Sequence, residues 1–330
     1  MPSTPLCTIA VPVYHRRSRA LAFAAIESAL AQPRSDVEIL VIDDHTTDGT
    51  WDDVSRIADP RARVLRNERN LGLFANFNRC LDESRGRYVR ILCSDDVLEP
   101  GTLDDELAVM ERHPEMALLS TRGLRVGADG RVLGLQAAAL PEGWYSGRRG
   151  IAAVLRANAA TGYNTLNYPS GVLLRRSAAD AAGRFRTEMR MVGDIEYFLR
   201  VLQQGALGVL NRVGCRITVH ADQVGSTLAL EPLVMQELFG LADVFEEELG
   251  DGAVRRRVRA GTGGLSAWQA LRATLGGDLR SAAAHLDVAR RNHVGAVAML
   301  TGFVGLLLRR SRWMLRGPFV PSGITPDRPL

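Results

Sequence analysis

The chain has 330 residues, of which 46% are hydrophobic and 24% are charged, as in a globular protein with one large α/β domain or a domain plus an appendage. All 41 basic residues are arginine, which excludes a Schiff-base mechanism and a Walker P-loop because both depend on lysine. The four cysteines show no CxxC spacing, so the sequence indicates neither a zinc site nor a disulfide framework, and we expect reduced thiols in a cytosolic compartment.

Apolar strands alternate with helical segments over the first hundred residues. The sequence predicts strands at residues 6–13, 37–42, 63–66 and 87–93. Between them it predicts helices at residues 19–31, 50–57 and 70–84. This alternation is typical of a mostly parallel sheet with βαβ crossovers, and the uninterrupted apolar strands fit burial on both faces.

The elements after residue 100 are more varied. We expect a helix at residues 100–112, a strand at 116–120, a hairpin turn at 127–130, a strand at 170–175, a helix at 195–204 and a strand at 212–219. Residues 136–168 carry no clear pattern apart from a helix near 148–157, and from residue 231 the pattern is helical throughout. We therefore predict an α/β domain over residues 1–226, a helical region over 227–317 and, because of its four prolines, a disordered tail over 318–330.

Charge is distributed unevenly along the chain, whose formal net charge is +4. Residues 255–330 hold 13 arginines and three acids, whereas residues 1–254 hold 28 arginines and 34 acids. A basic C-terminal part on an acidic body suggests contact with an anionic surface. A solvated helical face would give the same charge pattern, so both interpretations stay open.

The sequence shows neither a signal peptide nor a clear membrane-spanning helix. Its N-terminal apolar run is short and has no basic leader. The apolar stretch at residues 294–308 has 15 residues, fewer than the roughly 20 that cross a bilayer. Because four arginines follow between residues 309 and 316, this stretch could lie as an interfacial helix beside anionic lipid. It could equally pack on the α/β domain with its arginines in water.

Acidic residues follow two of the predicted strands at the point where each strand ends. Asp43 and Asp44 come directly after the second strand, and Asp95 and Asp96 follow the fourth. Because ligands bind beyond the carboxyl ends of parallel strands, we expect these carboxylates on one edge of the sheet. Oxygen ligands of this kind suit Mg²⁺ or Mn²⁺, and such a cation suits a diphosphate. For the first pair, a surface turn is the alternative.

Three further positions could contribute chemistry. The first strand ends in Pro12, Val13 and Tyr14, which lack the glycines of a dinucleotide-binding loop, and Tyr14 could pack against a flat base or simply cover the sheet edge. Asp194, near the start of a predicted helix, could act as a general base or cap that helix. His220, at the end of the last predicted strand, could contact a ligand or be a satisfied polar residue.

Taken in order along the chain, these motifs resemble the family 2 glycosyltransferases. The resemblance covers roughly residues 6–226 and rests on Val11-Pro12-Val13-Tyr14, Asp43-Asp44 with Asp48-Gly49-Thr50, Asn70-Leu71-Gly72 with Asn78, and Ser94-Asp95-Asp96. It implies a GT-A fold, which is Rossmann-like with a mostly parallel central sheet, followed here by a C-terminal helical appendage. It also implies a nucleotide-diphospho-sugar donor, a divalent metal (Mg²⁺ or Mn²⁺) and inversion at the anomeric carbon. In such a fold, residues 1–100 would form the nucleotide-sugar half and residues 100–226 the acceptor half.

The resemblance also implies roles for individual residues. Asp43 would bind the base, Asp95 would lie near the ribose and donor sugar, and Asp96 would hold the metal. Asp194 would be the general base, and His220 would lie near the diphosphate or the metal. The remaining residues of the predicted nucleotide site are Pro12, Val13, Tyr14 and Asp44.

The chain departs from the family pattern at two positions. Cys93 stands where the family often has a further aspartate, which shifts metal binding onto Asp96. Phe77 stands where the family often has an arginine before the helix asparagine. The sequence therefore leaves open which arginine, if any, meets the diphosphate.

We expect an inverting glycosyltransferase that transfers a sugar to a hydroxyl of a saccharide or lipid-linked acceptor, in the synthesis of cell-surface polysaccharide, glycolipid or another glycoconjugate. We expect it in the cytoplasm, peripheral on the inner face of the cell membrane through its arginine-rich C-terminus, and without a nucleic-acid partner. Two alternatives stay open. One is a sugar-nucleotide nucleotidyltransferase, although residues 14–17 match the glycine-rich basic loop of that class poorly. The other is a non-catalytic, membrane-associated scaffold with a GT-A-like fold.

Overall fold

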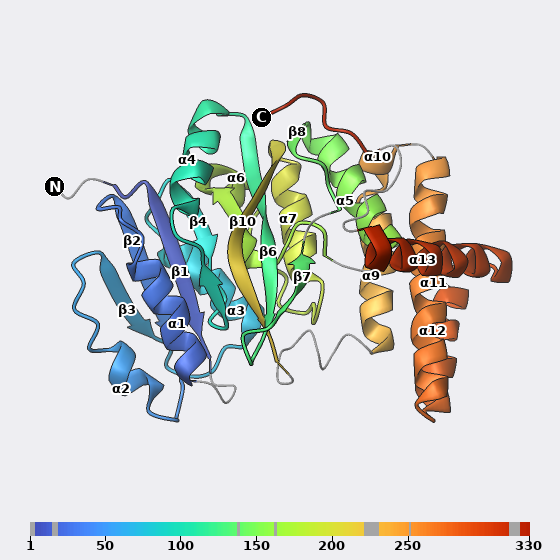
Figure 1. Ribbon diagram of the computed structural model, residues 1–330, viewed down its shortest axis with the longest axis horizontal. Coiled ribbons are helices and arrows are strands. Elements are labelled where there is room, and N and C mark those ends of the chain that lie inside the picture. Colours follow the sequence, from blue (N-terminus) through green and yellow to red (C-terminus); the bar gives the residue numbers. More distant parts are fainter. Residues whose placement is uncertain are drawn as a thin grey trace.

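The computed structural model describes residues 4–14, 19–136, 139–161, 164–220, 231–250, 252–316 and 324–330, and for residues 309–316 the backbone alone. A 10-stranded sheet lies at its centre, and helices from the C-terminal part of the chain stand beside the sheet (Figure 1). These elements confirm the predicted α/β fold with a mostly parallel central sheet and helices at the C-terminus.

The first half of the sheet is parallel. Its strands are β1 (Cys7–Val13), β2 (Val37–Asp43), β3 (Ala62–Arg66) and β4 (Tyr88–Ile91), which lie in the order β3-β2-β1-β4. They are connected by α1 (Arg19–Leu30), α2 (Thr50–Val54) and α3 (Leu73–Glu83). Every residue of β1 and β2 is buried because both faces are covered. Ile9 and Val11 pack on the side of α1, and Ala10 packs on the side of α3.

The second half of the sheet mixes strand directions. Its strands are β5 (Asp96–Leu98), β6 (Met116–Gly127), β7 (Val132–Gln136), β8 (Gly143–Tyr145), β9 (Val172–Arg175) and β10 (Ala206–Val219). Strand β9 lies between β4 and β6 and is antiparallel to both, whereas β10 is parallel to β6. Strands β5 and β8 pair antiparallel with β10. Strand β7 pairs antiparallel with β6, and the two strands form the hairpin whose turn the sequence predicts at residues 127–130. Strands β6 and β10 are longer than predicted, and they pair with each other along most of their length despite several register shifts.

The helices of this half cover both faces of the sheet. They are α4 (Thr102–Arg112), α5 (Gly147–Thr161), the 3-10 turn η1 (Pro169–Gly171), α6 (Arg176–Ala181) and α7 (Gly193–Leu202). Apolar residues of α4 share a buried cluster with α1, whereas those of α5 and α7 share a second cluster with α3. The two clusters are the hydrophobic cores on either side of the sheet.

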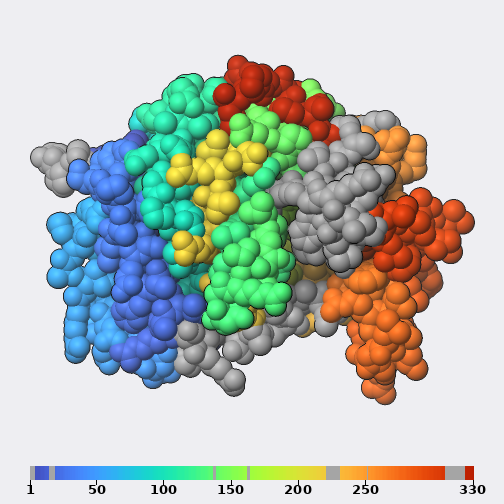
Figure 2. Space-filling model, viewed as in Figure 1, coloured from blue at the N-terminus to red at the C-terminus, as the bar shows by residue number. Residues whose placement is uncertain are grey.

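The C-terminal helices pack on the α/β part of the chain. They are α9 (Pro232–Val244), α10 (Glu246–Leu249), α11 (Gly252–Leu275), α12 (Leu279–Arg291) and α13 (Ala296–Arg316). Helix α11 contacts α5, α9, α12 and α13, and Phe239 and Val258 join the same buried core as α5 and α7. The predicted boundary at residue 226 lies outside the described residues. Figure 2 shows the helical hairpin of α11 and α12 projecting from one side of the molecule.

One bent pair of helices has the length and composition of a membrane span. The pair joins Leu279–Arg291 to Ala296–Leu308 at an angle of 116°. Within the part of the chain that the structure describes, no single helix is long and apolar enough to cross a membrane.

Residues 324–330 return to the sheet and pack beside β8 (dark red in Figure 2). The amide N–H of Trp144 donates to the carbonyl of Arg328 at 2.8 Å, and the carbonyl of Trp144 accepts from Asp327 at 2.8 Å. The guanidinium of Arg328 lies 4.4 Å from the centre of the Trp144 ring. The prolines predict a disordered tail over residues 318–330, but the amides of Asp327 and Arg328 donate to the Trp144 carbonyl of β8, so the prediction does not hold for residues 324–330.

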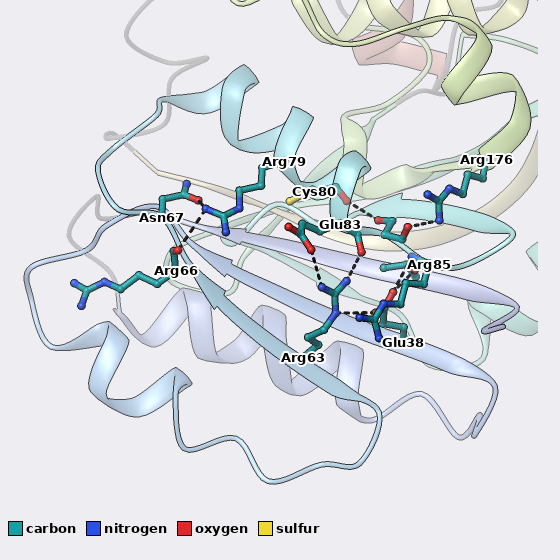
Figure 3. Close-up of polar contacts among 11 residues, drawn as sticks. Glu38, Arg63, Arg66, Asn67, Arg79, Cys80, Glu83, Arg85 and Arg176 are labelled. Atoms are coloured by element: carbon teal, nitrogen blue, oxygen red, sulfur yellow. Dashed lines mark hydrogen bonds and ion pairs between the residues drawn. The ribbon is translucent and has the colours of Figure 1, made fainter. Parts of the chain in front are cut away.

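A polar network fixes the edge of the sheet where β2 begins (Figure 3). The buried carboxylate of Glu38 accepts hydrogen bonds from the Thr8 hydroxyl at 2.7 Å and the Arg85 amide at 3.0 Å. It also pairs with Arg63 at 3.1 Å, and Arg63 continues to Glu83 of α3 at 2.8 Å. These partners meet the hydrogen-bonding needs of the buried Glu38 carboxylate, so we assign the network to holding the fold together. It lies at the opposite end of β2 from Asp43 and Asp44.

Candidate active site

A cavity of about 390 Å³ lies at the carboxyl ends of β1, β2 and β4, and this volume is typical of ligand pockets. Seven of the nine predicted site residues line it, namely Pro12, Tyr14, Asp44, Asp95, Asp96, Asp194 and His220. The other two, Val13 and Asp43, are buried in the strands behind it. The fold thus gathers in one cavity side chains that are far apart in the sequence.

Asp43, the last residue of β2, is fully buried, and the turn that follows occupies its carboxylate. The Thr46 amide donates to both carboxylate oxygens at 3.3 and 3.2 Å, and the Thr46 hydroxyl donates to Oδ1 at 2.6 Å. The Nε of Arg66 lies 3.1 Å from Oδ2. These contacts shape the turn between β2 and α2. The predicted contact of Asp43 with a base stays a prediction.

Asp44 lines the cavity and also holds one of its walls. Its carboxylate accepts the amide N–H groups of Leu71 at 2.8 Å and Gly72 at 3.0 Å, just before α3. The side-chain amide of Asn67 donates to Asp44 at 2.5 Å, and the side-chain oxygen of Asn67 accepts from the Arg79 guanidinium (Figure 3). Gly72 has a φ of 86°, which favours glycine. Asp44 therefore fixes the loop before α3 against the cavity.

Cys93, Asp95 and Asp96 form a cluster in which one candidate ligand atom from each residue lies within 4.8 Å of the others. Asp96 is buried at the start of β5, and its carboxylate accepts from the Ser170 hydroxyl at 2.6 Å and the Thr218 amide at 3.2 Å. Burial raises the pKa of Asp96 well above its ordinary value, and the negative charge of Asp95 adds to this shift. Two adjacent carboxylates, one of them buried, are costly to ionise without a positive partner. The cluster therefore fits a divalent cation, which prefers oxygen ligands.

His220 follows β10 and lies at this acidic cluster. Its Nε2 is 3.2 Å from Oδ2 of Asp95. Tyr14 follows β1 and leaves 48% of its surface exposed, so its ring is accessible at the rim of the cavity. The structure thus places both side chains at the cavity, and their contacts with a ligand stay predictions.

Asp194 lies in the first turn of α7 and faces the cavity. Its Oδ1 accepts the Ile195 amide at 2.8 Å, and its Oδ2 accepts the side-chain amide of Asn164 at 3.1 Å. Burial raises the pKa of Asp194 to about 7, although these hydrogen bonds act in the opposite direction. The helix N-cap is Val192, so Asp194 does not cap α7. A carboxyl group with a pKa near 7 is suited to proton transfer at neutral pH.

Sequence reasoning missed several residues at the site. Asn164 and Tyr168 belong to the stretch without clear periodicity, and burial, with the charge of Asp194, raises the pKa of Tyr168 to about 12. Arg190, in the loop before α7, is the one arginine among the described residues that line the cavity. No local pattern marks these side chains, because long-range folding places them. The sequence offered a signal for Arg190 alone, because this residue lies four positions before the predicted base Asp194.

Two curated relatives illustrate what the chain is similar to. Over 306 residues it is 27% identical to the uncharacterized protein MT1568 of Mycobacterium tuberculosis, and the alignment covers 90% of each chain. Over 89 residues it is 35% identical to WfaP of Escherichia coli, a UDP-Glc:alpha-D-GlcNAc-diphosphoundecaprenol beta-1,3-glucosyltransferase. This second match covers 27% of the present chain and 36% of WfaP, so it concerns part of each protein.

Solved structures of similar proteins establish the fold. The S. aureus TarS 1–349 structure in complex with UDP-GlcNAc matches with a TM-score of 0.62 at 16% identity and covers 98% of both chains. The mannosyltransferase PcManGT from Pyrobaculum calidifontis, in complex with GDP-Man and Mn²⁺, matches with a TM-score of 0.55 at 16% identity. That match covers 94% of the present chain and 88% of the mannosyltransferase. At these identities the likeness is one of fold, and it confirms the GT-A architecture.

The family model named glycosyl transferase family 2 matches residues 8–181, which is more than half of the chain. The matched region includes the strand ends that carry Asp43, Asp44, Asp95 and Asp96, whereas Asp194 and His220 come after it. With this match and the shared fold, the chain belongs to glycosyl transferase family 2 and is a glycosyltransferase.

Proposed function

We propose that the chain is an inverting, metal-dependent glycosyltransferase that moves a sugar from a nucleotide diphosphate to a hydroxyl of a saccharide or lipid-linked acceptor. One observation carries the proposal: Asp194, whose pKa burial raises to about 7, faces the same cavity as Asp95 and Asp96. The neighbours in complex with UDP-GlcNAc and with GDP-Man and Mn²⁺ support this class of donor. Residues 1–100 then form the nucleotide-sugar half, and residues 100–226 form the acceptor half.

The reaction is a single displacement at the anomeric carbon. The acceptor hydroxyl gives its proton to the Asp194 carboxylate while its oxygen bonds to that carbon. The bond from the carbon to the diphosphate oxygen breaks, and attack from the opposite face inverts the configuration. A bound Mg²⁺ or Mn²⁺ supplies positive charge for the leaving diphosphate. Asp96 and Asp95 would hold the ion, with His220 beside Asp95.

We assign the nucleotide to the part of the cavity formed by Pro12, Tyr14 and Asp44. The exposed ring of Tyr14 offers a surface on which a base can pack. Phe77 stands where the family pattern often has an arginine, so another arginine would have to meet the diphosphate. We assign this role to Arg190, the one arginine among the described residues that line the cavity. A bidentate guanidinium is well matched to phosphate oxygens.

A thermal-shift panel tests the proposed function. UDP-, GDP- and dTDP-linked sugars are added to the protein with and without Mn²⁺ or Mg²⁺. A ligand at 100 times its Kd stabilises the native state by about 2.7 kcal/mol, which raises Tm measurably. We expect at least one nucleotide sugar to raise Tm when metal is present, and its slow hydrolysis to release a nucleoside diphosphate. If no nucleotide sugar shifts Tm, the proposal fails, and release of pyrophosphate from a nucleoside triphosphate would favour a nucleotidyltransferase instead.

We also propose that α13 binds an anionic membrane surface, on the cytoplasmic face where a lipid-linked acceptor would be met. An exposed apolar stripe runs along this helix and comprises Val297, Leu300, Val304, Leu307 and Leu308. On the other side, Gly302 and Leu306 are buried where α13 packs on α11. Helix α13 contains no acid, and four arginines lie between residue 309 and its end. An apolar stripe followed by arginines fits a helix that lies in a bilayer interface.

Vesicle flotation tests the membrane proposal. We expect the wild-type protein to float with vesicles containing phosphatidylglycerol and much less with phosphatidylcholine alone. Each apolar side chain that leaves water contributes about 1.5–3 kcal/mol, so a double replacement of Leu300 and Val304 by glutamate should weaken binding by more than about tenfold. A double replacement of Val132 and Leu133, two exposed residues of β7, by glutamate is the matched control. Equal flotation of both variants would show that α13 is not the contact.

A further inference from the structure

The helix that carries Asp194 begins without a side-chain cap of its own. Its N-cap residue is Val192, at a φ of −104°, and the N-cap side chain makes no capping hydrogen bond. Backbone N–H groups at the start of a helix need acceptors from elsewhere. The preceding residues Arg190 and Met191 line the cavity, so the position of this segment also shapes the site.

The C-terminal helices supply the acceptor for the three amides that lead into α7, those of the N-cap residue and of the two residues before it. The carboxylate of Glu237, in α9, accepts the amide N–H of Arg190 at 2.8 Å, of Met191 at 3.1 Å and of Val192 at 3.0 Å. Three successive amides thus share one carboxylate, and both of its oxygens are used. The negative charge of Glu237 also lies near the start of α7, the positive end of the helix dipole. These are charge-assisted hydrogen bonds, the stronger kind in proteins.

Helix α9 holds Glu237 in place. Val234, Met235 and Phe239 on the same helix are buried in the core that α9 shares with α5 and α7. A second contact ties the same segment to the start of α9, because the Arg190 guanidinium lies 3.9 Å from the Glu231 carboxylate. The C-terminal helices therefore present the Glu237 carboxylate from a packed support.

We propose that Glu237 is a positioning residue for Asp194, which makes the C-terminal helices part of the catalytic unit. This inference rests on the proposed role of Asp194 as the general base. A base must lie within hydrogen-bond reach of the hydroxyl that it deprotonates, and a displacement of about 1 Å can cost roughly 100-fold in rate. The acids assigned to the metal and the donor sugar, Asp95 and Asp96, lie on other elements. Loss of Glu237 should therefore lower kcat by a larger factor than it raises the donor KM, to which Arg190 of the same segment contributes.

Two substitutions of Glu237 and one matched control test the proposal in the full chain. The control is Glu248→Ala, which removes the contact that Gln203, after the C-terminal end of α7, makes with Glu248 of α10. This contact joins the same two parts of the molecule at the other end of α7. The assay contains Mn²⁺ and one nucleotide sugar. This is the donor that wild-type protein turns over fastest among the UDP-, GDP- and dTDP-linked sugars.

We expect Glu237→Ala to lower kcat by roughly 10- to 100-fold and to raise the donor KM by a smaller factor, because Arg190 of the same segment is assigned to the diphosphate. Glu237→Gln keeps one acceptor oxygen, so its kcat should lie between those of wild type and Glu237→Ala. If Glu237→Ala does not fold, the kcat of Glu237→Gln decides the outcome. Glu248→Ala should keep the wild-type kcat. Amide hydrogen exchange, which needs no donor, should become faster at residues 190–192 in Glu237→Ala and remain unchanged there in Glu248→Ala.

Two results would overturn the inference. One is a wild-type kcat in Glu237→Ala. The other is an equal loss of kcat in Glu237→Ala and Glu248→Ala, because Glu237 would then merely fasten the helices to the α/β part. An inactive Asp194→Asn variant beside a fully active Glu237→Ala variant would remove the inference alone. A fully active Asp194→Asn variant would remove both the inference and the proposed base.

Discussion

Replacing Asp194 with asparagine is expected to lower kcat by roughly 100- to 10,000-fold, the range that a general base contributes. Asparagine has the size of aspartate and can still accept the Ile195 amide, but it cannot take the proton of the acceptor hydroxyl. Release of nucleoside diphosphate from the donor measures turnover. In wild type, kcat should rise with pH as Asp194 loses its proton, with the midpoint of the rise at about pH 7, and the variant should lack this rise.

Two controls separate a chemical defect from a folding defect in this variant. The variant should bind the donor as wild type does, because Asp95 and Asp96 lie on other elements. Its stability should also depend less on pH than that of wild type. Burial raises the pKa of Asp194 from 3.8 to about 7, so the folded chain binds this proton more tightly than the unfolded chain, and wild type loses stability as the pH rises through this interval. Asparagine does not ionise, so the Tm of the variant should rise relative to that of wild type as the pH is raised from about 5 to 8, and undiminished turnover would refute the assignment.

Replacing Asp96 with asparagine is expected to lower the affinity for Mn²⁺ by at least about 100-fold, since altering even a partner of a metal ligand costs 10- to 100-fold. The carboxylate of Asp96 already accepts from the Ser170 hydroxyl and the Thr218 amide. Asparagine would keep one acceptor oxygen and place an N–H donor where the second oxygen lies. Isothermal titration of Mn²⁺ into the protein with UDP or GDP measures the affinity.

A matched control for this substitution is Asp82→Asn. Asp82 belongs to α3, is exposed and pairs with Arg184 at 2.7 Å, outside the cavity. The control should retain the wild-type affinity for Mn²⁺. If Asp96→Asn retains it as well, the cluster of Cys93, Asp95 and Asp96 is not the metal site.

The sequence predicts the acidic side of the cavity well, for a physical reason. Buried parallel strands are recognisable in the sequence as uninterrupted apolar runs. In an open α/β sheet the carboxyl ends of such strands lie on one edge, where ligands bind. The ends of β2 and β4 therefore mark Asp44, Asp95 and Asp96 without any knowledge of distant contacts. Asp43 shows the limit of this rule, because the alternation of a strand sends neighbouring side chains to opposite sides. Its carboxylate binds Thr46 and the turn, while Asp44 lines the cavity.

Features that depend on long-range packing could not be predicted from local pattern. Strand β9 enters between β4 and β6 in the opposite direction, and nothing in its four residues specifies that place. The η1 turn before β9 contributes Ser170 to Asp96, a contact across 74 positions. Glu237 meets the start of α7 from 45 to 47 positions away, from a region that carries no catalytic motif. Such contacts follow from the packing of whole elements.

One calorimetric series tests the central claim most directly, namely that the acid cluster and Asp194 serve one donor in one cavity. The nucleotide sugar that wild type turns over fastest is titrated, with Mn²⁺, into wild type, Asp194→Asn and Asp96→Asn, and nucleoside diphosphate release is followed in the same samples. We expect wild type and Asp194→Asn to bind the donor equally, wild type alone to turn it over rapidly, and Asp96→Asn to bind it weakly. Rapid turnover by Asp194→Asn, or undiminished metal-dependent binding by Asp96→Asn, would contradict the account.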